Sequence, residues 1–136
     1  MRVTGGVSYK QGIVAESRPG FARVRFDDLD GLVTAWLPVI QPKTFLDKAV
    51  WTLDVGEQVA CVLDEYMESG CILGAVYSDV DTPPVSSADK IHLRFVDGTS
   101  MEYDRAGHKM LIHCIGDIKI SADGHMALTA ARIDLN

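Results

Sequence analysis

The stretch Lys90–Asn136, KIHLRFVDGTSMEYDRAGHKMLIHCIGDIKISADGHMALTAARIDLN, decides how this chain of 136 residues folds. Short apolar runs alternate with turn signals at Asp97-Gly98, Ala106-Gly107, Gly116-Asp117 and Asp123-Gly124, and the glycines lie 9, 9 and 8 residues apart. Several runs alternate apolar and polar residues, as half-buried strands do, and glycine supplies the positive φ of a tight turn. We therefore expect six short strands, over residues 91–95, 100–103, 109–115, 118–120, 126–128 and 133–135.

Six strands of this length make a poor core by themselves. Each would expose its backbone edges and bury only two or three side chains. Repeated units that cannot bury their own faces must stack on something else. The repeats therefore predict association with other copies of the same segment.

The N-terminal part predicts five strands and a small barrel. Alternating runs cover residues 11–17, 21–26, 32–39, 57–64 and 71–77, and Pro38 is expected to end the third strand. Residues 41–54 have no clear period and are expected to form a long loop. A five-stranded meander with one long excursion is typical of an OB-fold, and a small SH3-like barrel is the alternative. Residues 1–80 are thus predicted to be an OB-fold domain, and residues 81–89, with Pro83-Pro84 and two serines, a linker.

The composition argues against several functions. The hydrophobic share of 47% and the charged share of 24% are those of an ordinary soluble protein, and a net charge of −6 argues against nucleic acid as a partner. No apolar run reaches the roughly 18 residues of a membrane-spanning helix, and the first residues lack the apolar core of a signal peptide. Cys61, Cys71 and Cys114 are expected to be buried free thiols of a protein made in a reducing cytosol, with a Cys61–Cys71 bridge across a hairpin as the alternative.

The sequence indicates no catalytic chemistry. Asp27, Asp28 and Asp30 lack the glycine and the terminal glutamate of a calcium loop. The linker serines have no Gly-x-Ser-x-Gly context, and no glycine-rich phosphate loop is present. We therefore predict that the protein is not an enzyme.

Nine short motifs occur along both parts of the chain in a fixed order: Gly12–Glu16 (GIVAE), Arg23–Arg25 (RVR), Trp36–Val39 (WLPV), Gly56–Val59 (GEQV), Leu73–Tyr77 (LGAVY), Ile91–Gly98 (IHLRFVDG), Glu102–Asp104 (EYD), Gly116–Ser121 (GDIKIS) and Ala131–Asn136 (ARIDLN). Together they resemble the baseplate assembly protein V family, the central spikes of contractile phage tails, which are related to the spikes of type VI secretion. Each motif alone is weak, but their order and spacing together are specific.

The resemblance implies an all-β homotrimer, with an N-terminal OB-fold and an intertwined three-chain β-helix over residues 90–136. It implies a virion protein, synthesised in the host cytoplasm, that sits on a baseplate hub protein and pierces the host outer membrane when the tail contracts. Many relatives end in a His-x-His apex that holds iron, and some carry a lysozyme domain. This sequence has neither, so we expect no cofactor and either a blunt tip or a separate tip-capping protein.

In a three-chain β-helix alternate residues point toward a dry axis. The predicted inward residues are Ile91, Leu93, Phe95, Met101, Tyr103, Ile118, Ile120, Met126, Leu128, Ile133 and Leu135. Between Lys109 and Ile115 the phase is open: either Met110, Ile112 and Cys114 point inward, or Leu111, His113 and Ile115 do. In the second case three copies of His113 could hold an axial metal ion such as iron.

The two tryptophans of the chain have two possible roles, and the chain as a whole has alternative functions. Trp36 and Trp51 are either barrel core or a docking surface for the hub protein. The alternative function is an OB-fold module that binds an oligonucleotide or a glycan and is oligomerised by its C-terminal repeats. An enzyme whose site forms between subunits is a third reading, without a motif in its favour.

Overall fold

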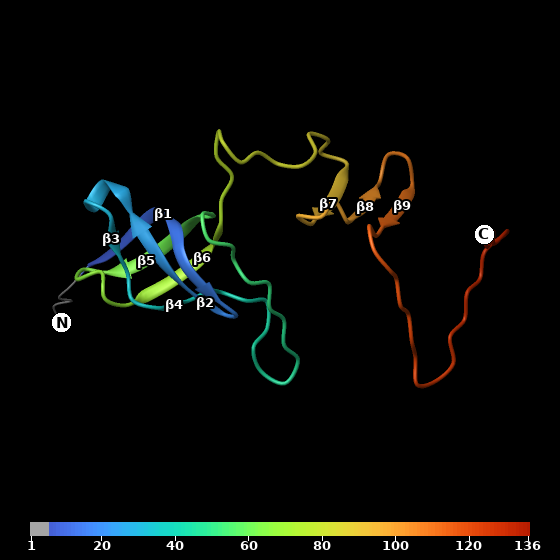
Figure 1. Ribbon diagram of the computed structural model, residues 1–136, viewed down its shortest axis with the longest axis horizontal. Helices are drawn as coiled ribbons and strands as arrows, with labels where there is room; N and C mark the ends of the chain where they lie inside the picture. The colour runs from blue at the N-terminus through green and yellow to red at the C-terminus, as the bar shows by residue number, and fades with distance from the viewer. Residues whose placement is uncertain (1–5) are drawn as a thin grey trace. The chain divides into compact units, whose positions relative to one another are not determined.

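The computed structural model describes residues 6–136. These residues form nine strands and one three-residue 3-10 turn, Asp27–Leu29, so the predicted all-β class is confirmed. The chain divides into two compact units, of which the first ends at Thr82 and the second begins at Pro83. Figure 1 shows the first unit in blue to green and the second in yellow to red.

The first unit is an antiparallel sheet of six strands. They are β1 (Val7–Arg18), β2 (Phe21–Phe26), β3 (Leu32–Val33), β4 (Leu37–Pro38), β5 (Gln58–Asp64) and β6 (Gly70–Ala75). The order is β3-β2-β1-β5-β6, and β4 pairs with β2 beyond the end of β3. Val39 forms a parallel bridge with Ile72, and the backbone N–H of Ile40 donates to the Ile72 carbonyl at 3.0 Å. The segment after β4 thus reaches the other edge of the sheet, so the sheet curls upon itself.

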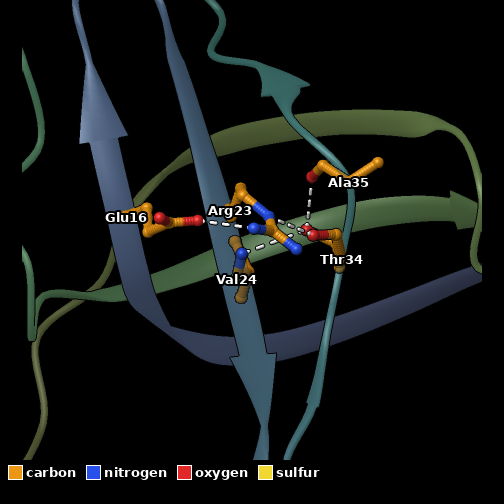
Figure 2. Close-up of polar contacts among 5 residues, drawn as sticks. All are labelled: Glu16, Arg23, Val24, Thr34 and Ala35. Carbon is orange, nitrogen blue, oxygen red and sulfur yellow. Dashed lines mark hydrogen bonds and ion pairs between the residues drawn. The ribbon is translucent and has the colours of Figure 1, made fainter.

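The predicted third strand, residues 32–39, is wrong as a continuous element, because the chain turns inward at Thr34. Thr34 is buried, its Oγ1 accepts the backbone N–H of Val24 at 3.0 Å, and its hydroxyl donates to the Ala35 carbonyl at 2.7 Å. Figure 2 shows these bonds and the Arg23 side chain, which donates to the Thr34 carbonyl and to Glu16. These bonds replace the strand ladder between β3 and β4. Pro38 does end β4, as predicted.

The other strand boundaries move by a few residues. The first strand begins at Val7 rather than at residue 11, because β5 supplies partners for Val7 through Ile13. Strand β2 has the predicted bounds, and β5 and β6 start or end within two residues of the prediction.

The core of the first unit lies inside the curled sheet. Alternate residues of β2 are fully buried and pack against buried residues of β1, β4, β5 and β6. The cluster comprises Val14, Ala22, Val24, Phe26, Leu37, Val59, Cys61, Leu63 and Ile72. Gly12 is required here, since a Cβ atom would lie 2.5 Å from Val24 Cγ1 and 2.8 Å from the Arg25 carbonyl oxygen.

All three cysteines are free, but only Cys61 is fully buried. The expectation of three buried thiols is therefore wrong for Cys71 and Cys114. In the β5–β6 ladder Cys61 lies opposite Ile72 and Cys71 lies opposite Val62. Because neighbouring strand residues point to opposite faces, the two sulfurs extend from different faces of the sheet, which argues against the alternative bridge.

The second unit contains a three-stranded antiparallel meander. Strand β7 (Lys90–Arg94) pairs with β8 (Ser100–Asp104), and β8 pairs with β9 (Lys109–His113). Gly98 has φ +95 in the first turn, as predicted, but in the second turn His108, with φ +52, takes the left-handed conformation instead of Gly107. Gly116 and Gly124 have no positive φ either.

Three of the six predicted C-terminal strands do not form in the single chain. Residues 114–136 contain no strand, so the predictions at 118–120, 126–128 and 133–135 are not met. A strand requires a hydrogen-bonded neighbour. Within the described chain, no backbone N–H of residues 116–136 donates a hydrogen bond. Figure 1 shows this segment in orange to red as an extended run without arrows.

Candidate interaction surfaces

The three-stranded sheet exposes an apolar face. Residues that face each other in an antiparallel ladder point to the same side of the sheet. Ile91 lies opposite Tyr103 and Leu93 opposite Met101, and on β9 Met110 and Ile112 lie opposite the same two β8 residues. These six side chains form one surface, the apolar sheet face, and each is at least 37% exposed.

On the opposite face of this sheet three charged or titratable side chains of β7 and β8 are partly buried. His92 Nδ1 lies 2.9 Å from Glu102 Oε1, and Lys90 Nζ lies 3.6 Å from Glu102 Oε2. The His92 and Glu102 side chains are only 14% and 18% exposed. The apolar side chains of β7 and β8 are thus more exposed than His92 and Glu102, which reverses the usual arrangement in a soluble sheet.

The register shows which residues of β9 share a face with the apolar residues of β8. Met110 and Ile112 belong to the apolar sheet face, whereas Leu111 lies opposite Glu102 and His113 opposite Ser100, on the polar face. This corresponds to the first of the two phases, in which His113 points away from the apolar residues.

The eleven predicted inward residues are all exposed in the single chain. Five lie on or beside β7 and β8, and six follow along residues 118–135, where the exposure reaches 90% at Leu135. Exposed apolar side chains gathered on one sheet face are typical of a site of association. Within the described residues no backbone N–H of 116–136 donates a hydrogen bond, so side chains and main-chain N–H groups are both available to another chain.

A second surface lies at one end of the first unit. The Arg18 guanidinium carbon lies 4.4 Å from the Trp36 ring centroid and 5.1 Å from that of Phe21. Trp36 is 37% exposed and Trp51 is 61% exposed, and neither belongs to the core cluster. The reading of the two tryptophans as barrel core is therefore wrong.

The long loop predicted at residues 41–54 emerges at the same end. The Val39 N–H donates to the Gly20 carbonyl at 2.9 Å, and the Ser17 hydroxyl donates to the Leu53 carbonyl at 2.5 Å, so both ends of the loop are tied to the β1–β2 turn. Figure 1 shows the loop between β4 and β5 projecting from the sheet.

The loop presents apolar side chains in a costly conformation. Phe45 is 77% and Leu46 is 81% exposed, and Leu46 has φ +65, a left-handed conformation. Such a conformation costs on the order of 1–3 kcal/mol in a residue other than glycine and is concentrated at functional sites. We call the exposed side chains at this end the loop-end surface; they are Arg18, Phe21, Trp36, Ile40, Phe45, Leu46, Val50 and Trp51.

Two aspartates of the acidic loop at residues 27–30 form ion pairs, and the two aspartates with a lowered pKa lie in turns. The carboxylate of Asp27 pairs with Arg25 and that of Asp28 with Lys10. The backbone N–H of Glu68 lowers the pKa of Asp64, and the backbone N–H of Thr99 lowers the pKa of Asp97, both in tight turns.

Within residues 6–136 no group of three or more histidine, cysteine or acidic side chains is placed to hold a metal ion. Over the same residues no helix is long and apolar enough to cross a membrane.

Sequence reasoning found only part of these surfaces. It named the two tryptophans and the eleven alternating apolar residues of the second unit's strands and tail as candidates, but it missed Arg18 and Phe21. Their signal is the turn Arg18-Pro-Gly-Phe21, which places a cation and an aromatic ring opposite each other in the β1–β2 ladder.

Comparison with known proteins gives one informative match. No protein-family profile matches the chain. The chain is 27% identical over 121 residues to the spike protein of Escherichia phage P2, and the aligned region covers 88% of this chain. It spans 57% of the length of that protein. An all-β chain with an exposed apolar face and an unpaired C-terminal segment is thus similar in sequence to a phage spike protein.

Proposed function

We propose that this protein is a structural, non-enzymatic component of a virion: the homotrimeric central spike of a contractile phage tail baseplate. One observation carries the proposal. The segment that resembles a spike in sequence exposes its apolar residues and leaves its backbone unpaired in the single chain. Similarity to the phage P2 spike protein supports the same reading.

In the proposed assembly residues 90–136 of three chains wind into an intertwined β-helix. The eleven predicted inward residues, together with Met110 and Ile112 of the apolar sheet face, would then surround a dry axis. Residues 118–120, 126–128 and 133–135 would become strands when the neighbouring chains supply their ladders. Lone chains gain almost none of this burial, so folding of the segment and assembly would be one event.

The first unit is the proposed attachment to the baseplate. Its curled six-stranded sheet, with a long excursion between β4 and β5, is compatible with the OB-fold that the sequence suggests. The loop-end surface, with Trp36 and Trp51, is the proposed contact with the hub protein.

The proposed function is mechanical. Winding three chains removes every strand edge except those at the ends, and the result is a stiff, narrow rod. Such a rod would concentrate the force of the contracting sheath on a small patch of the host outer membrane.

Hydrogen exchange of the purified full chain tests the proposal. The β-helix requires that backbone amides of residues 116–136 be hydrogen-bonded between chains, so they should be protected as strongly as those of β2 and β5. In a chain that acts alone these amides have no partner and would exchange at the rate of an unfolded peptide. Unprotected amides in this segment would refute the proposed β-helix.

A further inference from the structure

The loop-end surface carries a cation whose charge no residue of the described chain neutralises. Lys10, Arg23 and Arg25 each have an acidic partner within 2.8 Å. Arg18 has none within ion-pair distance, and its recorded contacts are the faces of Trp36 and Phe21. A paired arginine is therefore the rule in the described part of the first unit's sheet, and Arg18 departs from it.

The stacking prepares Arg18 for a planar acceptor. A guanidinium that lies on aromatic rings keeps the N–H groups on its edge free and loses little further side-chain freedom when they bind. The geometry of those N–H groups matches the two oxygens of a carboxylate. The side chain is exposed at the end of β1, so a ligand can reach it from solvent.

The surroundings favour a protein as the source of that carboxylate. The loop-end surface is mainly apolar and aromatic, and tryptophan with arginine is the composition of interface hot spots. The loop of residues 41–54 carries Lys43 and Lys48 against Asp47 and Asp54, so it adds no net charge around Arg18 in a chain of net charge −6. A nucleic acid would meet the repulsion of the remaining acidic chain, whereas one carboxylate set among apolar side chains complements the surface.

We propose that Arg18, held between Phe21 and Trp36, is the anchor for an aspartate or glutamate of a partner protein, whose neighbouring apolar side chains pack on Phe45, Leu46 and Trp51. That the partner is the baseplate hub protein rests on the proposed function. The chemistry of the contact rests only on the surface described above.

A peptide selection tests the anchor without knowledge of the partner. A yeast-displayed library of random dodecapeptides is selected on the full chain, and the best peptide is synthesised for titration. We expect enriched peptides to carry an aspartate or glutamate beside aromatic or aliphatic residues. Arg18→Gln should weaken the synthesised peptide by roughly 10- to 30-fold, the loss expected at an interface hot spot.

The controls separate this contact from general charge and from misfolding. Arg25→Gln removes the same charge from a position paired with Asp27, and should leave binding unchanged. Arg18→Lys keeps the charge without the planar fork, and an intermediate loss is expected. Replacing the acid of the peptide by its amide probes the same contact on the unaltered protein, so the test does not depend on a variant that folds.

Each outcome decides the proposal. Enriched peptides without acids, no enriched peptide at all, or equal binding to Arg18→Gln and to the original chain would overturn the anchor. A chain that is monomeric in solution and still binds acidic peptides through Arg18 would overturn the spike and keep the anchor. A chain that is trimeric in solution and binds peptides equally well with and without Arg18 would overturn the anchor and keep the spike.

Discussion

Ile120 distinguishes a chain that acts alone from one that assembles. The side chain is 74% exposed in the single chain, and no strand surrounds it. A lone chain would therefore tolerate Ile120→Asp without loss of stability. In the proposed trimer the same substitution places three carboxylates close to the axis, where they would be both buried and mutually repelling.

The magnitude follows from the surface that remains to be buried. Complete burial of an isoleucine side chain is worth about 1.5–3 kcal/mol, and roughly three-quarters of it would be gained on assembly. Three copies together thus lose about 3–7 kcal/mol of burial free energy in the Ile120→Asp trimer, before the cost of desolvating the three carboxylates. At about 1.4 kcal/mol for each factor of ten, the assembly constant should fall by at least two orders of magnitude.

Sedimentation velocity of the two purified chains over a dilution series measures this effect. Ser121→Asp is the matched control, because it adds the same carboxylate at the next residue, which would point away from the axis of the proposed trimer. We expect Ser121→Asp to stay trimeric and Ile120→Asp to dissociate or precipitate. Equal trimer content in both variants would refute the inward assignment of Ile120.

Three further predictions concern the buried Thr34, the β5–β6 turn and the buried Cys61 of the first unit. Thr34→Val keeps the shape of the buried side chain but leaves the Val24 N–H without its hydroxyl acceptor at 3.0 Å, so the free energy of unfolding in urea should fall by about 1–3 kcal/mol, with a smaller loss for Thr34→Ser. The Glu68 N–H lowers the pKa of Asp64 below its usual 3.8. The resulting stabilisation of the β5–β6 turn is therefore present at neutral pH and is lost as the pH falls through the lowered pKa. A carbon NMR titration of the Asp64 carboxyl group should show a midpoint below 3.8, and a midpoint at or above 3.8 would contradict the turn geometry. Burial, with a smaller contribution from Cys71, raises the pKa of the Cys61 thiol to about 11. In a variant whose only cysteine is Cys61, a disulfide reagent at pH 8 should therefore label this thiol only when the chain unfolds. An ordinary thiol of pKa about 8.5 would instead react in the native state.

The sequence predicted the first unit well where alternation is strict. Strand β2 was placed correctly because Ala22, Val24 and Phe26 alternate with exposed or half-exposed residues. The break of the third strand at Thr34 was not predictable from the period. It depends on a hydroxyl that bonds across to Val24, and only the packed structure brings the two together.

In the second unit the sequence predicted more strands than one chain can form. The period-two pattern at residues 118–135 indicates which side chains share a face, but it does not provide a neighbouring strand. The phase of residues 109–115 was undecidable from the sequence because Met110, Leu111 and Ile112 are all apolar. Pairing of β9 with β8 shows that Met110 and Ile112 share a face with Tyr103 and Met101.

The loop-end surface was predictable only in part. The two tryptophans stood out by residue type, but their exposure depends on how the loop is tied to the β1–β2 turn by Ser17 and Gly20. The stacking of Arg18 depends on the same arrangement, since Trp36 reaches it through the pairing of β4 with β2.

The central claim is that the unpaired apolar segment of one chain is completed by two others. The most direct measurement is the mass of the purified full chain by light scattering coupled to size-exclusion chromatography. The account predicts a single species of three times the chain mass of 14.8 kDa, unchanged on dilution through the micromolar range. A monomer at these concentrations would contradict the three-chain β-helix and the spike function that depends on it.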